Sequence, residues 1–247
     1  MFAILVGNGW KKYWQKYVLL DVLIDKPDYP EIIDKKIDLP ILIQDGESTS
    51  VRMIGINSLI GDKLTAFAPN TIGVTYDSGK HLSMLKQLYN IDLLIDVATN
   101  LPLVSETFKI SAQKEIDYLQ ENIKIGDVYS DILKTSFLLA SGFLNRLKDK
   151  ESIAKYKFFE KGLAALNSFL PGTKRFTRLD VLLAASRSAY ITSIIQTGKL
   201  EEFKLFDNNI QIDDYLFSEK PENQWNKLSK LPGGVLYYLK QAYDLTK

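Results

Sequence analysis

The sequence contains no cysteine and only one histidine, and these two scarcities exclude much of the chemistry open to a chain of 247 residues. Without cysteine there is no disulfide framework, no thiolate nucleophile, and no zinc or iron–sulfur site built on sulfur. With His81 alone, no site can use two imidazoles, and a Ser-His-Asp triad would depend on that residue. We find no spacing of serine and acid that supports such a triad, and we interpret His81 as a surface residue.

Long apolar runs and a net charge of either sign are also lacking. No stretch approaches the roughly 20 consecutive apolar residues that a membrane span requires. The apolar start of the chain ends at Val6 and is shorter than the core of a signal peptide. The formal net charge of +1 creates no global field toward nucleic acid or membrane, so contact with either would need a local patch. We therefore expect a cytoplasmic protein without a membrane contact.

The composition is that of a folded protein, and the first third predicts mixed strands and helices. Hydrophobic residues make up 46% of the chain and charged residues 25%. The almost continuously apolar segment 17–25 predicts a strand buried on both faces, with a helix fragment as the alternative. Segment 37–44 predicts a second strand at a sheet edge, because Pro40 cannot donate to a ladder. Segment 51–56 predicts a third strand, paired with the second as a hairpin.

From Asn57 onward the apolar period becomes helical. Asn57 or Ser58 can cap a short helix whose apolar residues recur at Ile60, Leu64 and Phe67. Further helices are predicted at about 80–98, 102–122, 127–147, 152–169, 177–197 and 233–245, with a short strand possible at 210–212. The sequence thus predicts an α+β fold, with an α+β part over residues 1–100 and a helical bundle domain over 101–247.

Two charged residues of the first part are candidates for chemistry. Asp21 lies in the middle of the apolar segment 17–25, where a carboxylate must be paired, protonated or bound to a metal. The alternative is an edge residue that faces water or pairs with Lys16 or Lys35. Lys63 lies in the short capped helix, where it is either a cation for a triphosphate or an ordinary exposed lysine.

The helix at 80–98 has a polar stripe and one misplaced acid. At 100° per residue, one narrow face carries the polar residues Ser83, Lys86, Gln87 and Asn90. Asp92 falls near the centre of the opposite, apolar arc. It therefore either faces a polar cavity or caps a neighbouring group inside the interface.

A basic cluster begins one of the later helices. Its members are Lys174, Arg175, Arg178 and Arg187. Such a cluster is either a solvated face or a set of phosphate contacts to an RNA.

One stretch carries a recognisable signature. It runs Gly-Asp-Lys-Leu-Thr-Ala-Phe-Ala-Pro-Asn-Thr-Ile-Gly-Val over 61–74, followed by Lys-Gln-Leu-Tyr-Asn-Ile over 86–91 and Leu94. This signature resembles the AbiEii/AbiGii-type nucleotidyltransferase toxins, the toxin half of type IV toxin–antitoxin systems. The resemblance covers about residues 17–98, and beyond residue 100 it extends only to the helical character.

The resemblance implies a nucleotidyltransferase-like sheet whose carboxylates hold magnesium. Two such ions would orient an NTP and activate a hydroxyl of an RNA or protein acceptor. Asp21 would be a metal ligand, Lys63 a phosphate-binding cation, and Lys86 and Asn90 would help to bind the nucleotide. We take Asp21, Lys63 and Asp92 as the candidate catalytic residues. An antitoxin protein would be a partner in toxin–antitoxin or antiphage defence.

The chain departs from the family pattern at the acidic positions. No Asp-x-Asp pair precedes Asp21, and Asn90 stands where the family has an aspartate after tyrosine. Asp92 points about 160° away from Asn90 on an ideal helix. We therefore expect the nucleotidyltransferase-like part to be incomplete and transfer by this chain to be impaired. The alternative is a non-catalytic helical binding module that contacts a protein partner or RNA.

Overall fold

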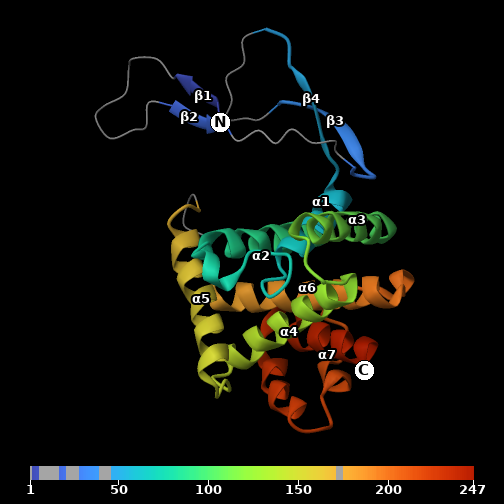
Figure 1. The fold of residues 1–247 in the computed structure, drawn as a ribbon. Coiled ribbons are helices and arrows are strands. Elements are labelled where there is room, and N and C mark those ends of the chain that lie inside the picture. The colour runs from blue at the N-terminus through green and yellow to red at the C-terminus, as the bar shows by residue number, and fades with distance from the viewer. Residues whose placement is uncertain (1, 6–16, 21–27, 39–45, 171–174) are drawn as a thin grey trace.

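A computed structural model describes residues 2–5, 17–20, 28–38, 46–170 and 175–247, and these form a mainly α-helical protein with minor β-structure (Figure 1). The strands are β1 (Phe2–Leu5), β2 (Tyr17–Leu20), β3 (Ile32–Lys36) and β4 (Ser50–Ile54). The α-helices are α1 (Ile56–Ala66), α2 (His81–Ile95), α3 (Leu101–Leu119), α4 (Ile125–Phe143), α5 (Lys150–Asn167), α6 (Arg178–Thr197) and α7 (Val235–Thr246). Among the described residues, no helix is both long and apolar enough to cross a membrane.

The described strands form two separate antiparallel pairs. β1 pairs with β2, and β3 pairs with β4 in a register that places Ile33 opposite Met53. Figure 1 shows the β3–β4 ribbon standing outside the helical body. Apolar side chains are exposed on the ribbon, because neither of its faces is packed against a second described layer.

The predicted hairpin exists, but one of its strands was placed wrongly. β4 matches the predicted third strand, whereas its partner is β3 at 32–36 and not the segment 37–44. Residues 37 and 38 lie beyond the end of β3, and 39–45 lie outside the described residues. The strand predicted at 210–212 is also wrong, because Ile212 instead begins a short 3₁₀-helix that ends at Tyr215.

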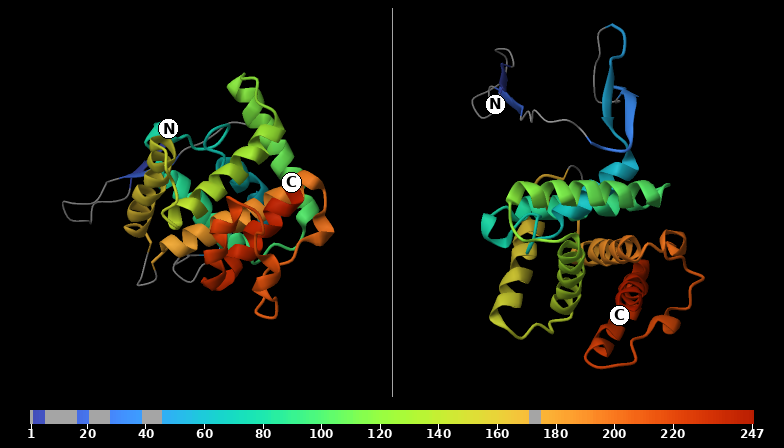
Figure 2. Two further views of the ribbon diagram at one scale, coloured as in Figure 1. Left: turned by 90° about the horizontal axis from the view of Figure 1, so that it is seen from below. Right: turned by 45° about the vertical axis from the view of Figure 1, so that its right-hand side comes forward.

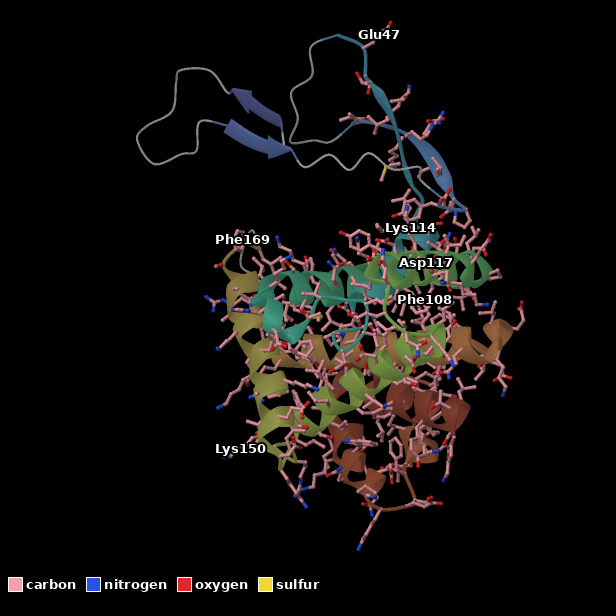
Figure 3. All side chains as sticks on the ribbon, in the orientation of Figure 1. Glu47, Phe108, Lys114, Asp117, Lys150 and Phe169 are labelled. Atoms are coloured by element: carbon pink, nitrogen blue, oxygen red, sulfur yellow. The ribbon has the colours of Figure 1, made fainter. Side chains whose placement is uncertain are left out.

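The helices pack in layers around one large apolar core. Figures 1 and 2 show α2 and α3 in one layer above α4 and α6, with α7 on the far side of α6 and α5 crossing at one end. The core cluster takes side chains from both sides of residue 100, from Ile60 of α1 to Ile195 of α6. Phe108 of α3, labelled in Figure 3, stacks on Tyr129 of α4 with ring centroids 5.1 Å apart.

Helix α1 begins two or three residues earlier than its sequence predicts. Its N-cap is Gly55, and the side chains of Asn57 and Ser58 point to other partners. Asn57 Oδ1 accepts the N–H groups of Thr99 and Asn100, each at 3.0 Å. Ser58 Oγ accepts the hydroxyl of Thr107 at 2.9 Å. These residues therefore join α1 to α3 and to the chain that enters α3.

In two loops, an asparagine side chain forms the same pair of hydrogen bonds with the backbone of a phenylalanine. Asn167 Oδ1 accepts the N–H of Phe176 at 2.9 Å, while its Nδ2 donates to the carbonyl of Phe176 at 2.8 Å. Asn226 forms the same pair with Phe217, at 2.8 and 3.0 Å. Each amide replaces the backbone partner that a strand would supply, which allows a phenylalanine in an irregular segment to enter the core.

Gly61 permits the close contact of α1 with α3. A Cβ at this position would lie 2.6 Å from the carbonyl oxygen of Val104 and 2.8 Å from the backbone nitrogen of Phe108. Both obstacles are backbone atoms of α3, so no side chain can move aside to make room. The separation of these two helices is therefore set by the absence of a side chain.

We predict that Gly61→Ala lowers the free energy of unfolding by about 2 kcal/mol, because overpacking outweighs the gain in helix propensity. Gly126→Ala in α4 is the matched control, since a Cβ there meets nothing within 4 Å. It should leave stability unchanged or raise it by up to about 0.5 kcal/mol. Urea unfolding of both variants tests this, and equal midpoints for the two would contradict the packing argument.

Candidate functional site

Of the candidate catalytic residues, Lys63 is paired with a carboxylate that lines an open pocket, and Asp21 lies outside the described residues. The Lys63 ammonium contacts Asp62 Oδ2 at 3.0 Å, and both side chains are 26% exposed. Asp62 also accepts the Tyr29 hydroxyl at 3.2 Å. The lysine is thus held at the solvent-facing side of α1 by a carboxylate that a phosphate group could displace.

The pocket beside this pair has a volume of about 400 Å³. Asp62 and Thr65 of α1 line one wall, and the chain from Ile72 to Lys80 lines another. Gly73 is required in that wall, because a Cβ there would lie 2.5 Å from the carbonyl oxygen of Ala66. The volume falls in the range of small-molecule sites.

The signature residues of α2 lie on its half-buried polar side. Lys86 is exposed and its ammonium lies over the Phe169 ring, 5.4 Å from the centroid. Asn90 is half-buried one turn further along, and next to it Tyr89 packs edge-on against Phe176. Among the described residues, no hydrogen bond or ion pair joins Lys63 to either Lys86 or Asn90.

Asp92 of α2 pairs with a neighbouring group inside the helix interface and does not face a polar cavity. Its Oδ1 lies 3.1 Å from Nη1 of Arg187 on α6, while Nη2 of the same guanidinium lies 3.1 Å from Asp96. The guanidinium also lies over the Tyr238 ring of α7, 5.7 Å from the centroid. Asp92 therefore joins three helices through one arginine, and no described contact links it to Lys63.

Burial dominates the electrostatics of this ion pair. It raises the pKa of the Asp92 carboxyl above its ordinary value of 3.8, and the opposing effect of the Arg187 guanidinium is smaller. The side chains of Arg187 and Asp92 are only 13% and 20% exposed. The ion pair is thus a structural contact whose cost of desolvation is large.

The basic cluster predicted near residue 175 does not form one described surface. Arg187 is engaged inside the helical body, and Arg175 is exposed. Arg178 donates to the Tyr156 hydroxyl at 2.7 Å and lies 3.6 Å from Glu160. Lys174 lies outside the described residues. The members are separated because α6 turns Arg178 and Arg187 toward different neighbours.

His81 also differs from its interpretation as a surface residue. It is half-buried at the start of α2, and its ring packs edge-on against Phe158 with centroids 5.3 Å apart. This aromatic contact gives it a packing role.

The described residues do not fit a magnesium site. They contain no group of three or more carboxylate or imidazole side chains placed to hold a metal ion. Asp62 and Glu115 both line the pocket beside Lys63. Two carboxylates, one of them already paired with the Lys63 ammonium, supply too few free oxygen ligands for the ion. We therefore derive no step through magnesium from this part of the chain.

Sequence reasoning overlooked a second polar pocket, which is built around Asp131 of α4. Asp131 is only 4% exposed and accepts hydrogen bonds from Asn70, Thr71 and Thr135. The available signal was its position: Val128, Ile132 and Thr135 lie on the same helix face, so the carboxylate falls on a buried stripe.

No known protein family, curated protein or solved structure matches this chain.

We predict that Arg187→Met lowers the free energy of unfolding by about 3 kcal/mol, because Asp92 is then buried without a partner. Arg178→Met is the matched control and should cost below about 1 kcal/mol, since its ion pair with Glu160 is half exposed. Adding Asp92→Asn to Arg187→Met should restore part of the loss in a double-mutant cycle. Additive effects of the two substitutions would contradict the direct coupling.

Asp92 should also make stability depend on pH. Because its pKa is higher in the folded than in the unfolded chain, the folded state binds the proton more tightly. Its contribution to the free energy of unfolding is therefore fully present below pH 3.8 and is lost as the pH rises through the folded pKa. Denaturant unfolding across this window should show the loss in the parent chain and not in Asp92→Asn. A loss of the same size in both proteins would assign it to other groups.

Proposed function

We propose that this chain is a nucleotidyltransferase-like toxin component of a toxin–antitoxin or antiphage system, and that its described part binds the nucleotide without completing the catalytic centre. The supporting observation is the place of Lys63. The cation that the resemblance assigns to phosphate is paired with Asp62, and Asp62 lines a pocket formed mostly by the same signature segment.

The signature also folds as a connected unit, which supports a shared role for its parts. Val74 N–H donates to the carbonyl of Ala66 at 3.1 Å, so the chain leaving α1 folds back on the end of that helix. Helices α1 and α2 then pack against each other, and Leu64 of α1 and Leu88 of α2 both belong to the main core. Lys63, Lys86 and Asn90 are thereby fixed on one rigid frame, although no contact joins them.

In this proposal Asp21 would be a magnesium ligand, as the resemblance implies. The acceptor is a hydroxyl of an RNA or a protein, and an antitoxin protein regulates the activity. Asp92 has a structural role in this scheme, because its carboxylate is engaged by Arg187.

The second candidate function is a non-catalytic helical module that binds a protein partner or RNA. It is favoured by an exposed face of α5 that carries Lys150, Lys157 and Lys161, each without an ion-pair partner in the described part of the chain. Figure 3 shows Lys150 at one end of α5 and Phe169 just past the other. Saturable binding to a co-encoded protein or RNA, without affinity for any NTP, would select this function over the first.

Nucleotide binding tests the first proposal. We expect calorimetry to detect saturable binding of at least one of ATP, GTP, CTP and UTP with magnesium, and Lys63→Met to weaken it about tenfold by removing one charged hydrogen bond. Lys109→Met, an exposed lysine of α3, is the control and should bind as the parent chain does. Equal affinities of the two variants, or no binding of any of the four nucleotides, would refute nucleotide recognition at Lys63.

Transfer is expected to be weak even if the nucleotide binds. Loss of the groups that hydrogen-bond to a metal's ligands typically lowers metal affinity or activity roughly 10–100-fold, and missing carboxylate ligands should lower it further. Incubating the chain with radiolabelled NTP, magnesium and total RNA should therefore give little or no labelled product. Strong labelling that Asp21→Ala abolishes would show that the chain is a competent transferase.

A further inference from the structure

A second pocket lies between α4, α5 and the segment that follows α1. Its volume is about 370 Å³, and its wall includes Asn70, Thr71, Tyr76, Ser130, Lys134 and Lys155. It shares no lining residue with the pocket beside Lys63. A role for it is therefore independent of the proposed nucleotide site.

One wall of this pocket is held rigidly by a buried carboxylate. Asp131 Oδ2 accepts the N–H of Asn70 at 2.7 Å and the hydroxyl of Thr71 at 2.9 Å, and Oδ1 accepts the Asn70 side-chain amide. Thr135 Oγ1 donates to Oδ1 at 3.2 Å. With four donors, the carboxylate is saturated, so it orients the wall and has little capacity left for a ligand.

The ammonium of Lys155 on α5 is held in place before any ligand binds. It donates to Asn70 Oδ1 at 2.9 Å and pairs with Glu151 at 2.7 Å. It also lies over the Tyr76 ring, 5.3 Å from the centroid. An ammonium has three hydrogens, so one remains for a ligand, and little side-chain entropy is left to lose when the ligand binds.

Lys134 and Ser130 add donors without partners. They lie one turn apart on α4, and neither forms a hydrogen bond or ion pair with any residue that the structure describes. Asp127, the other acid of the lining, accepts the N–H of Lys124 at 2.8 Å at the start of α4. The donors with free capacity at the pocket therefore include two cations, Lys134 and Lys155, and the hydroxyl of Ser130.

We propose that this pocket binds the phosphate group of a small phosphate ester. Lys134 and Lys155 supply charge from two helices, Ser130 supplies a neutral donor, and the three match the several acceptor oxygens of a phosphate. A volume of about 370 Å³ exceeds that of the phosphate alone, so the rest of the ester lies along Leu138 and the Thr71 wall. Inorganic phosphate is the minimal ligand with the same chemistry.

Calorimetry of the full chain with inorganic phosphate and with AMP tests this proposal. Both should bind saturably, and AMP should bind more tightly because it fills more of the pocket. Lys134→Ala should weaken both by about tenfold, and Ser130→Ala by less, because a neutral donor contributes less than a charged one. Lys134 is exposed, so its removal should not affect folding.

Lys109→Ala on the exposed side of α3 is the matched control and should bind as the parent chain does. If AMP and phosphate bind equally and Lys134→Ala weakens both, the natural ligand is the free anion and the phosphate site stands. Absence of saturable binding, or the same affinity in Lys134→Ala and Lys109→Ala, overturns the phosphate site. Lys63→Met should leave AMP binding at this pocket unchanged, so the outcome is separable from that of the nucleotide proposal.

Discussion

The whole arrangement depends on how helix α1 is fixed. Its backbone lies against α3 at Gly61, and its first turn is tied by Asn57 to Thr99 and Asn100. These contacts hold α1 by both close packing and buried hydrogen bonds, which together tolerate little displacement. Lys63 lies on α1, and Asp62 and Thr65 of the same helix line the pocket. The positions of these side chains are therefore set by contacts that α1 makes on its other side.

Buried polar groups have a comparable role elsewhere in the helical body. Asp131 holds the segment after α1 against α4, and Arg187 joins α2, α6 and α7. Neither group adds much net stability, because taking a charge out of water costs about as much as its contacts return. Their effect is on specificity: a helix that slipped by one turn would leave a charge buried and unpaired. The polar contacts thus define which of many compact packings is adopted.

The parts of the fold that the sequence predicts well are those encoded locally. Helix α6 was predicted within one residue, because Thr177 and Asp180 form a capping box and Gly198 ends the helix in a left-handed conformation. The strand partner of β4 and the cap of α1 were predicted wrongly. The pattern predicts a local cap at Asn57, yet the N–H groups that its Oδ1 accepts lie more than 40 residues away. Local propensity cannot show that distant backbone groups compete with the helix start for the Asn57 side chain.

For the candidate site too, locally encoded features could be predicted from the sequence and distant partners could not. The polar stripe of α2 and the misplaced Asp92 follow from helical period alone. The partner of Asp92 does not, because Arg187 is 95 residues distant and the sequence offers many cations. The pocket around Asp131 was overlooked for the same reason, since its walls come from three separated segments. The role of Asp21 stays a prediction, because that residue lies outside the described ranges.

The asparagines that close the two loops have a chemical consequence over time. Asparagine is a thermolabile residue, and hydrolysis of its amide replaces an N–H donor with an acceptor oxygen. At Asn167 and Asn226 that oxygen would face the carbonyl of a phenylalanine, so an attraction would become a repulsion. The positions of the two phenylalanines therefore depend on asparagine amides that hydrolyse slowly. Deamidation at either asparagine would loosen its loop while the surrounding helices stay intact.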